Sequence, residues 1–288
     1  MQEYLQLLKL NLLNIGFASL DDTWDFDNVF SPFSRLYYIT SGTAKVYHNN
    51  QEFYLKPNHM YLIPSNTYSR YKCDFYHEQY YISFLEEIGN GLSIYNFRNF
   101  KYEIEASTKD LQFFKRLLEI NPERSLINSK PKSYDNQTAF QKFNKQNERL
   151  STKRYLETKG ILSVLFSKFI KDANNLSHTS KNENINKSII YISENLNQKL
   201  TVKDLAAYCH LSKDHFSKSF EKNFGMRPIR YIQSKRIQRA QLLLLTTFDS
   251  LTEIAEKVGL DNMSYFIRIF KKFTGKTPSN FRKEELNM

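Results

Sequence analysis

The chain states one pattern twice near its end, and this repeat constrains the fold more than any other feature. The stretch "LAAYCHLSKDHFSKSF" begins at Leu205, and "IAEKVGLDNMSYFIRIF" begins at Ile254. Each copy is preceded by a hydroxyl residue with a carboxylate three positions later, which is the pattern of a helix capping box. Each copy then has two phenylalanines four residues apart, on one helical face. A short helix, a turn and a longer helix predict two helix-turn-helix motifs.

Glycines mark the turns of the repeat. Gly259 stands between the two helices of the second copy, where it accepts a positive φ freely. The first copy has His210 there, so its turn either avoids positive φ or tolerates a small cost. Gly225 and Gly275 end the longer helices. The segment 228–245 between the copies predicts a helix of roughly 27 Å. That length approaches the ~34 Å between successive major-groove faces, so the repeat predicts two recognition helices held apart on DNA.

The face of each longer helix opposite its phenylalanines carries the candidate DNA contacts. Arg268 suits a bidentate contact to guanine, and Met263 and Ile267 suit thymine methyl groups. Lysines here neutralise phosphates, and Asp214 either accepts from cytosine or repels misplaced phosphates. The predicted DNA-binding residues are Lys213, Asp214, Ser217, Lys218 and Lys222 in the first copy and Met263, Ser264, Ile267, Arg268 and Lys272 in the second. The alternative is that these are solvated residues of a helical interaction module.

Two residues of the repeat region have structural interpretations. Arg236 lies on the apolar stripe of the connecting helix, where we expect an internal ion pair that braces the two halves, with a phosphate contact as the alternative. Cys209 aligns with Val258, which predicts a small core residue. Cys73 is the second of only two cysteines, so a disulfide framework is not expected.

Charge is distributed unevenly along the chain. Residues 1–108 carry 8 Lys and Arg against 12 Asp and Glu, whereas 109–182 carry 15 against 7 and 183–288 carry 18 against 11. A basic body behind an acidic head favours a nucleic-acid partner. No apolar run approaches the ~20 residues that span a bilayer, and the N-terminus does not resemble a signal peptide. We therefore expect a cytoplasmic protein without a membrane partner.

Residues 30–84 alternate in the manner of strands, with turn signals between short aromatic-rich runs. This pattern predicts a small antiparallel barrel or sandwich. Tyrosines suit a sugar or an aromatic ligand, since they offer an apolar face and a hydroxyl. The candidate ligand-binding residues are Tyr37, Tyr38, Tyr61 and Tyr68, with core packing as the alternative. His48, His59 and His77 form no His-x-His pair, so no metal, cofactor or catalytic residue is predicted.

The middle of the chain changes to a helical period. Leu111, Phe114, Leu117 and Leu118 share one face of a helix that begins near Thr108, and this face either dimerises or closes the barrel. The polar stretch 121–137 is interpreted as an exposed loop, and a second helix is expected over 153–173. The predicted division is a sensor domain over 1–105, a helical dimerisation or packing region over 106–173, a linker over 174–186 and a DNA-binding domain over 187–288, with helix-turn-helix motifs at about 201–225 and 250–275.

The last hundred residues resemble the DNA-binding domain of the AraC/XylS family of bacterial transcription regulators. Residues in register with that family's pattern are Ala255, Gly259, Tyr265, Phe266, Phe270, Lys271, Lys272, Gly275 and Pro278, while Leu260 replaces a common phenylalanine. Residues 30–84 resemble the family's cupin-like effector domain more weakly. The resemblance implies an α+β protein of two domains, a cupin-like antiparallel β-barrel with following helices and an all-α domain with two helix-turn-helix motifs joined by a long helix.

The same resemblance implies a sequence-specific regulator that binds double-stranded promoter DNA as a homodimer, under control of a small-molecule effector in the barrel, with RNA polymerase as a further partner. Two alternatives remain at this point. In one, the N-terminal domain only dimerises or binds a protein partner. In the other, the chain is a cupin enzyme with a DNA-binding tail.

Overall fold

The structure is a computed structural model, and it describes residues 5–88, 93–96, 98–171 and 180–284. The chain divides into two compact units. The first contains Met1–Ile88 and Arg98–Asp172, and the second contains Gly89–Phe97 and Ala173–Asn287. Each unit has its own hydrophobic core, and each is described by itself below.

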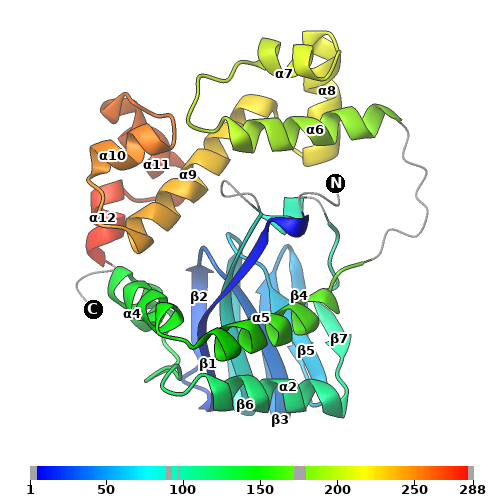
Figure 1. The fold of residues 1–288 in the computed structure, drawn as a ribbon, viewed down its shortest axis with the longest axis vertical. Helices are drawn as coiled ribbons and strands as arrows, with labels where there is room; N and C mark the ends of the chain where they lie inside the picture. The colour runs from blue at the N-terminus through cyan, green and yellow to red at the C-terminus, as the bar shows by residue number, and fades with distance from the viewer. Residues whose placement is uncertain (1–4, 89–92, 97, 172–179, 285–288) are drawn as a thin grey trace. The chain divides into compact units, whose positions relative to one another are not determined.

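The first unit is built on one antiparallel sheet, as the sequence predicted (Figure 1). Its strands follow the order β1-β6-β3-β5-β7, while β2 pairs with β6 and β4 with β3. The strands are β1 (Leu8–Asp21), β2 (Asp25–Phe30), β3 (Ser34–His48), β4 (Gln51–Leu55), β5 (His59–Ile63), β6 (Tyr68–Ile88) and β7 (Glu103–Glu105).

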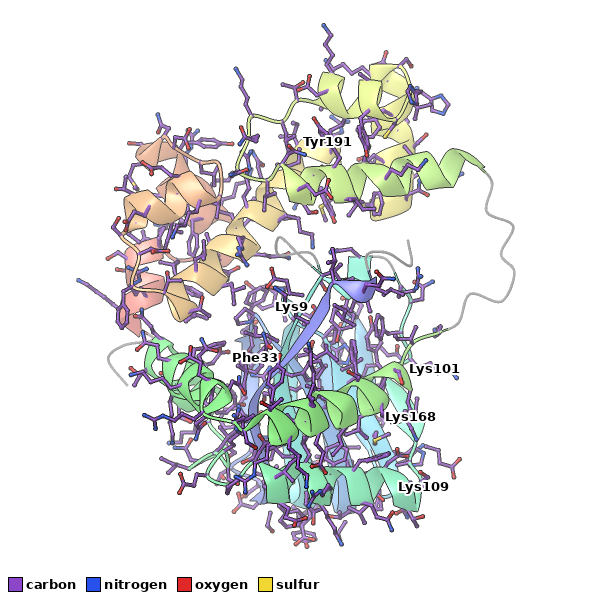
Figure 2. All side chains as sticks on the ribbon, in the orientation of Figure 1. Lys9, Phe33, Lys101, Lys109, Lys168 and Tyr191 are labelled. Atoms are coloured by element: carbon purple, nitrogen blue, oxygen red, sulfur yellow. The ribbon has the colours of Figure 1, made fainter. Side chains whose placement is uncertain are left out.

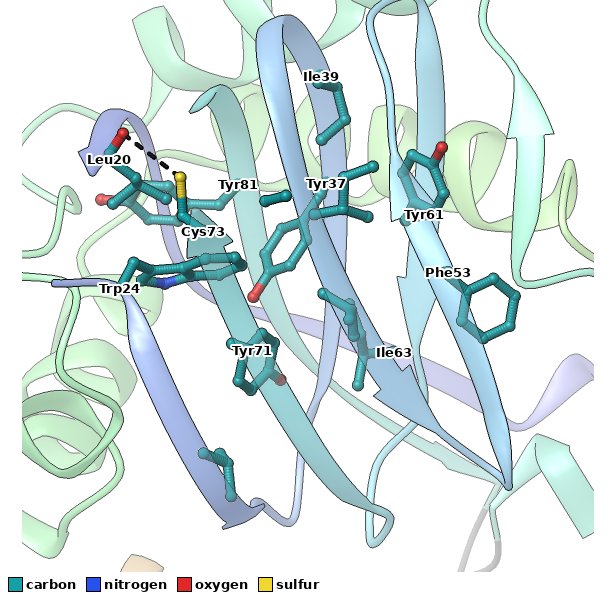
Figure 3. Close-up of a cluster of buried hydrophobic side chains, with 14 residues drawn as sticks. Leu20, Trp24, Tyr37, Ile39, Phe53, Tyr61, Ile63, Tyr71, Cys73 and Tyr81 are labelled. Atoms are coloured by element: carbon teal, nitrogen blue, oxygen red, sulfur yellow. Dashed lines mark hydrogen bonds between the residues drawn. The ribbon is translucent and has the colours of Figure 1, made fainter. Parts of the chain in front are cut away.

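The two long strands β3 and β6 change partners along their length, and bulges bend them where they do so. The pairing of β3 with β6 shifts register between Ile39 and Ser41 and again between Gly42 and Ala44. Gly42 has φ +68°, and a Cβ atom there would clash with the Tyr76 carbonyl of β6. Only glycine fits this close backbone approach. The bent sheet surrounds an aromatic-rich core that includes Trp24, Tyr37, Tyr61 and Tyr71 (Figure 3).

Helices cover one face of this sheet (Figure 1). They are α2 (Thr108–Ile120), α4 (Gln137–Glu148) and α5 (Thr152–Ser167), which contact β1; the short α3 (Pro131–Tyr134) precedes α4 and contacts it. Phe114 of α2 packs on Tyr38 with ring centroids 5.8 Å apart, and Phe166 of α5 packs on Phe84 at 5.3 Å. Lys168, labelled in Figure 2, binds the buried Asp110 carboxylate of α2 at 2.6 Å. The α2 stripe therefore packs on the sheet.

Two expectations for the middle of the chain are wrong. The stretch 121–137 is not an exposed loop, because α3 lies within it and Arg124, Tyr134 and Asp135 are buried. Its polar residues are used inside the fold. Arg124 Nη1 donates to the carbonyls of Leu12 and Leu13 beside a bulge in β1, and Asn147 Nδ2 also donates to the Leu12 carbonyl. The second helix was expected to reach residue 173, but α5 ends at Ser167.

The second unit is helical, which confirms the predicted class. Its elements are a short 3₁₀ turn η1 (Ile94–Asn96) and α6 (Ser180–Glu194), α7 (Val202–Tyr208), α8 (Lys213–Phe224), α9 (Pro228–Thr246), α10 (Leu251–Lys257), α11 (Met263–Thr274) and α12 (Pro278–Glu284). Tyr191 of α6, labelled in Figure 2, packs on Tyr208 of α7 with ring centroids 4.4 Å apart. Within the described ranges, no helix is both long enough and apolar enough to cross a bilayer.

The linker predicted over 174–186 is wrong from Ser180 onward, where α6 already runs; its first part, 174–179, lies outside the described residues. Polar composition suggested a linker. However, Ile185, Ile189 and Ile192 recur every three to four positions and are 1% exposed. This apolar stripe gives α6 a face to bury, and burial outweighs the weak helix propensity of the flanking Asn and Ser residues.

Candidate nucleic-acid interface and ligand cavity

The two helix-turn-helix copies begin with the same cap. The Thr201 backbone N–H donates to Asp204 Oδ2 at 3.1 Å, and the Asp204 N–H donates to Thr201 Oγ1 at 3.2 Å. The Ser250 N–H donates to Glu253 Oε2 at 2.6 Å, and the Glu253 N–H donates to Ser250 Oγ at 3.2 Å. The Thr201 hydroxyl also donates to Asp204 Oδ2 at 2.7 Å, and this bond, with that from the Thr201 N–H, lowers the pKa of Asp204. The Ser250 N–H is the main cause that lowers the pKa of Glu253. Both predicted capping boxes are confirmed.

The turns inside the copies also share one conformation. His210 has φ +55° and Gly259 has φ +70°, so the first copy tolerates the left-handed residue rather than avoiding it. The residue after each turn donates back to the first helix, Leu211 N to Ala206 O at 2.9 Å and Leu260 N to Ala255 O at 2.8 Å. Both longer helices end at left-handed glycines. The repeated sequence therefore encodes a repeated backbone.

In α8, the two phenylalanines are fully buried and the opposite face is open. Phe216 and Phe220 are 0% exposed. Ser217 is half-buried, and its hydroxyl donates to the Lys213 carbonyl at 2.8 Å. The remaining predicted contacts of this helix are exposed, namely Lys213, Asp214, Lys218 and Lys222.

In α11 the corresponding face mixes charged, polar and apolar side chains. Ile267 is 37% exposed, and the Arg268 guanidinium lies 5.3 Å from the centroid of the Tyr265 ring. Met263 is only half-exposed, because it packs against the cluster that includes Phe266. The exposed candidates of this helix are Ser264, Ile267, Arg268 and Lys272.

Arg236 does brace two parts of the helical unit, but not by the expected ion pair. Its Nε donates to the Leu196 carbonyl at 2.9 Å, and its Nη2 donates to the Gln198 carbonyl at 2.6 Å. Burial is the largest influence on its pKa and lowers it. The segment between α6 and α7 has free carbonyls, and a guanidinium fork satisfies two of them at once. The expectation of a carboxylate partner was wrong because sequence does not reveal unpaired backbone groups.

Cys209 is 1% exposed and burial raises the pKa of its thiol, so it is the core residue that its alignment with Val258 predicts.

The three histidines of the first unit lie in different surroundings. His48 stacks on Phe53, His59 Nδ1 lies 3.0 Å from the Pro57 carbonyl, and His77 Nε2 lies 3.0 Å from Gln79 Oε1. Across the described residues, no three His, Cys, Asp or Glu side chains gather as metal ligands would.

The first unit contains a cavity of about 400 Å³. Of the four candidate tyrosines, Tyr37 alone lines it. Tyr38 packs on Phe114, Tyr61 donates to the Tyr54 carbonyl at 2.7 Å, and Tyr68 is 53% exposed. Tyr37 shares the cavity with residues that the sequence interpretation missed, chiefly Trp24, Arg35, Gln79, Tyr81 and Tyr134. A signal existed for Arg35: it is a charged residue two positions before Tyr37, on the same face of an otherwise buried strand.

The chain matches two family models. Residues 15–87 match the model of an AraC-like ligand binding domain, and residues 205–284 match the model of a helix-turn-helix domain. The first match covers β1 to β6 and the cavity walls that these strands supply. The second covers both helix-turn-helix copies.

Relatives and a solved structure agree with these matches. The chain is 42% identical over 93 residues to the bifunctional transcriptional activator/DNA repair enzyme AdaA of Bacillus subtilis, which is 32% of this chain and 44% of that protein. It is 31% identical over 132 residues to the arabinose operon regulatory protein of Escherichia coli, which is 45% of each. The chain spans less than half the length of these curated relatives.

The structure of ToxT from Vibrio cholerae has the same fold, with a TM-score of 0.50 over 96% of this chain and 98% of ToxT, at 16% identity. An antiparallel sheet domain matched by an AraC-like ligand binding model is thus followed by a helical domain with two capped helix-turn-helix copies, matched by a helix-turn-helix model. The chain therefore combines a domain similar to AraC-like ligand binding domains with a helix-turn-helix domain.

Proposed function

We propose that this protein is a sequence-specific transcription regulator that binds double-stranded promoter DNA through α8 and α11. The observation that carries the proposal is the pair of backbones with the same caps and turns, each presenting the outer face of its longer helix to solvent. A helix presented in this way suits the major groove. The relatives named as transcriptional activator and operon regulator support the same function.

The two helices have different tasks in this proposal. The α8 face carries Lys213 and Lys218 and no apolar candidate, which suits phosphate contacts that set position. The α11 face adds Ile267 and Arg268, which suit a thymine methyl group and a guanine edge. The Arg268 guanidinium lies over the Tyr265 ring. A guanidinium that is already positioned loses less conformational freedom when it binds a base. We propose that α11 supplies most of the base discrimination.

The test is selection from a library of random duplexes at fixed salt, followed by affinity measurements on the selected site. Wild type should select two sequence blocks about one helical turn apart. Arg268→Ala should relax preference at one base pair, with a loss of about 1–3 kcal/mol of discrimination. Lys218→Ala should weaken all sequences evenly and lower the salt slope by about 1.

Lys153→Ala is the matched control, since it removes an exposed charge from α5 in the first unit. It should leave both the selected sequence and the salt slope unchanged. Tight binding by wild type without any enriched sequence would contradict the proposed specificity. Equal loss at every base pair for Arg268→Ala would contradict its reading role.

We propose further that the cavity of the first unit binds a small-molecule effector. Its volume of about 400 Å³ lies in the range of small-molecule sites, and aromatic walls with a few polar groups are typical of them. The alternative, a first unit that only dimerises or binds a protein, is favoured if no compound changes operator affinity. An effector acts by binding one arrangement of the two units better than another.

The protein is proposed to act as a homodimer in the cytoplasm, where promoter DNA and RNA polymerase are present. Leu156 and Val164 of α5 are 61% and 43% exposed on the helix surface, and a dimer would cover them. Sedimentation of wild type and Leu156→Glu tests this, and an unchanged mass would contradict a dimer through α5.

RNA polymerase is a proposed partner because AdaA is named a transcriptional activator. No catalytic activity is proposed, since the relatives are mostly named as regulators, although AdaA is also named a DNA repair enzyme.

A further inference from the structure

A buried guanidinium lies at the wall of the cavity with incomplete hydrogen bonding. Arg35 is 3% exposed and lines the cavity. Its Nη2 donates to Ser31 Oγ at 2.7 Å, but its Nε has no hydrogen-bond partner. The rings of Phe33 and Tyr134 lie 4.5 Å and 5.6 Å from the guanidinium carbon. A buried cation with an unused donor is costly unless a further acceptor reaches it.

The nearest carboxylate does not complete that bonding. Asp135 Oδ2 lies 4.0 Å from Arg35 Nη2, beyond hydrogen-bond distance, and accepts from the Ser31 hydroxyl instead. The other oxygen, Oδ1, is buried without a partner. Burial raises the pKa of Asp135 to about 6. Arg35 and Asp135 thus form a loose pair in which each partner keeps an unsatisfied atom.

The rest of the cavity wall is aromatic, apolar or uncharged. Trp24 and Tyr37 lie edge to face at 6.5 Å between ring centroids, and Trp24 lies 5.2 Å from Tyr71 (Figure 3). Tyr81 and Gln79 add a hydroxyl and an amide. Among the described residues that line the cavity, Arg35 is the one whose side chain is charged at neutral pH. The site therefore presents one fixed positive charge beside flat apolar surfaces.

We propose that the effector is a small organic monocarboxylate with a ring or compact apolar body, and that its carboxylate binds Arg35 in place of Asp135. This inference rests on the proposed effector role of the cavity. A carboxylate matches the guanidinium fork with two parallel hydrogen bonds, which the distant Asp135 does not provide. The body of the ligand lies between Trp24, Tyr37 and Tyr81, whose rings favour planar apolar groups. A cation is disfavoured by Arg35, and a neutral ligand leaves the loose pair as it is.

Replacement of Asp135 by the ligand carboxylate also links the cavity to the helices of the first unit. Asp135 and Tyr134 belong to the segment 121–137, which borders the cavity. The same segment is tied to the cavity wall where the Leu126 N–H donates to the Tyr81 hydroxyl at 2.7 Å. Asp135 immediately precedes Asn136, the N-cap of α4. A ligand that displaces the Asp135 carboxylate therefore acts directly before the N-cap residue of α4.

The experiment compares acids with their neutral isosteres on the full-length protein at neutral pH. The probes are two pairs, benzoate with benzamide and phenylacetate with phenylacetamide, with thermal stabilisation and isothermal calorimetry as readouts. At least one acid should bind, and its amide should bind at least about tenfold more weakly. Asp135→Asn removes the competing charge at nearly constant shape, so the acid should bind this variant about tenfold more tightly than wild type.

Arg35→Gln should abolish the preference for the acid, whereas Arg154→Gln, which removes an exposed arginine from α5, should keep it. If Arg35→Gln fails to fold, the acid–amide comparison on wild type and Asp135→Asn still decides. The inference is overturned if no acid outbinds its amide on either protein, including the case in which nothing binds. Duplex selection with the same preparations distinguishes failure of this inference from failure of the proposed function. If the protein selects a DNA site but shows no preference for an acid, only this inference is rejected. If it binds an acid but selects no DNA site, the proposed function is rejected.

Discussion

Gly259 offers the sharpest test of how the helical unit is held together. A Cβ atom at this position would lie 2.8 Å from the Leu196 carbonyl oxygen and 2.9 Å from Arg236 Nη2. Gly275 has a similar left-handed backbone, φ +79°, but no atom lies within 4 Å of the corresponding Cβ position. The two glycines therefore separate a conformational cost, which both share, from a packing cost, which only Gly259 has.

Gly275→Ala should lower the free energy of unfolding of the helical unit by about 1–2 kcal/mol, the cost of a left-handed alanine. Gly259→Ala carries the same cost and also pushes against the Arg236 clamp. Loss of one of the charged hydrogen bonds that Arg236 donates adds about 1.5–3 kcal/mol, for a total of about 2.5–5 kcal/mol. With a urea m-value of about 1–2 kcal/mol/M, the midpoints should fall by about 1 M for Gly275→Ala and about 2–3 M for Gly259→Ala.

The assay is urea unfolding followed by far-ultraviolet circular dichroism, to which the helices of both units contribute, and by tryptophan fluorescence, which reports the first unit alone. The transition seen by circular dichroism but not by fluorescence is that of the helical unit. The chain has one tryptophan, Trp24, which is buried in the sheet core of the first unit. Its transition should stay unchanged in both variants and so serves as an internal control. Equal midpoint shifts for the two glycine variants would refute the argument that the Leu196–Arg236 contact makes Gly259 special.

Three further predictions concern other parts of the chain. Gly160→Ala should stabilise the first unit by about 1 kcal/mol, because Gly160 is exposed within α5 and has open space at its Cβ position. A lower melting temperature for this variant would count against the prediction. Burial lowers the pKa of His48 from 6.5 to about 4. As the pH falls from 6.5 to 4, the unfolded state therefore binds a proton that the folded state does not, and the free energy of unfolding falls by at most about 3 kcal/mol. His48→Gln should remove that part of the pH dependence, as measured by Trp24 fluorescence in urea at both pH values, and parallel profiles for the two proteins would contradict it. Cys209→Val should cost less than about 1.5 kcal/mol by circular dichroism, since Val258 occupies the matching position, and a larger loss would show that the two copies pack differently there.

Local sequence determined much of the helical unit. Capping boxes, glycine stops and phenylalanines four residues apart are short-range signals, because each depends on groups within one helical turn. They identified both copies and the face of α8 and α11 that stays open. The burial of Met263 was not predicted: its spacing places it on the open face, but its side chain packs against the hydrophobic cluster that includes Phe266.

The cavity shows what local sequence could not determine. Of Tyr37, Tyr38, Tyr61 and Tyr68, only Tyr37 lines the cavity; Tyr38 follows it in β3 and so points to the opposite face of the sheet. Which tyrosine faces inward depends on strand register, and register is fixed by partners far away in sequence.

The polar stretch 121–137 makes the same point with charged groups. Its composition is that of a loop, but Arg124 is buried and its guanidinium donates to the carbonyls of Leu12 and Leu13, more than one hundred residues earlier in the chain. Asp135 is buried beside Arg35, one hundred residues earlier in the chain. The sequence by itself determined that this protein carries two helix-turn-helix motifs, because their signals lie within a few residues of each other. The tertiary structure alone decided where the cavity is and which charge lines it, because buried polar groups take their partners from distant segments.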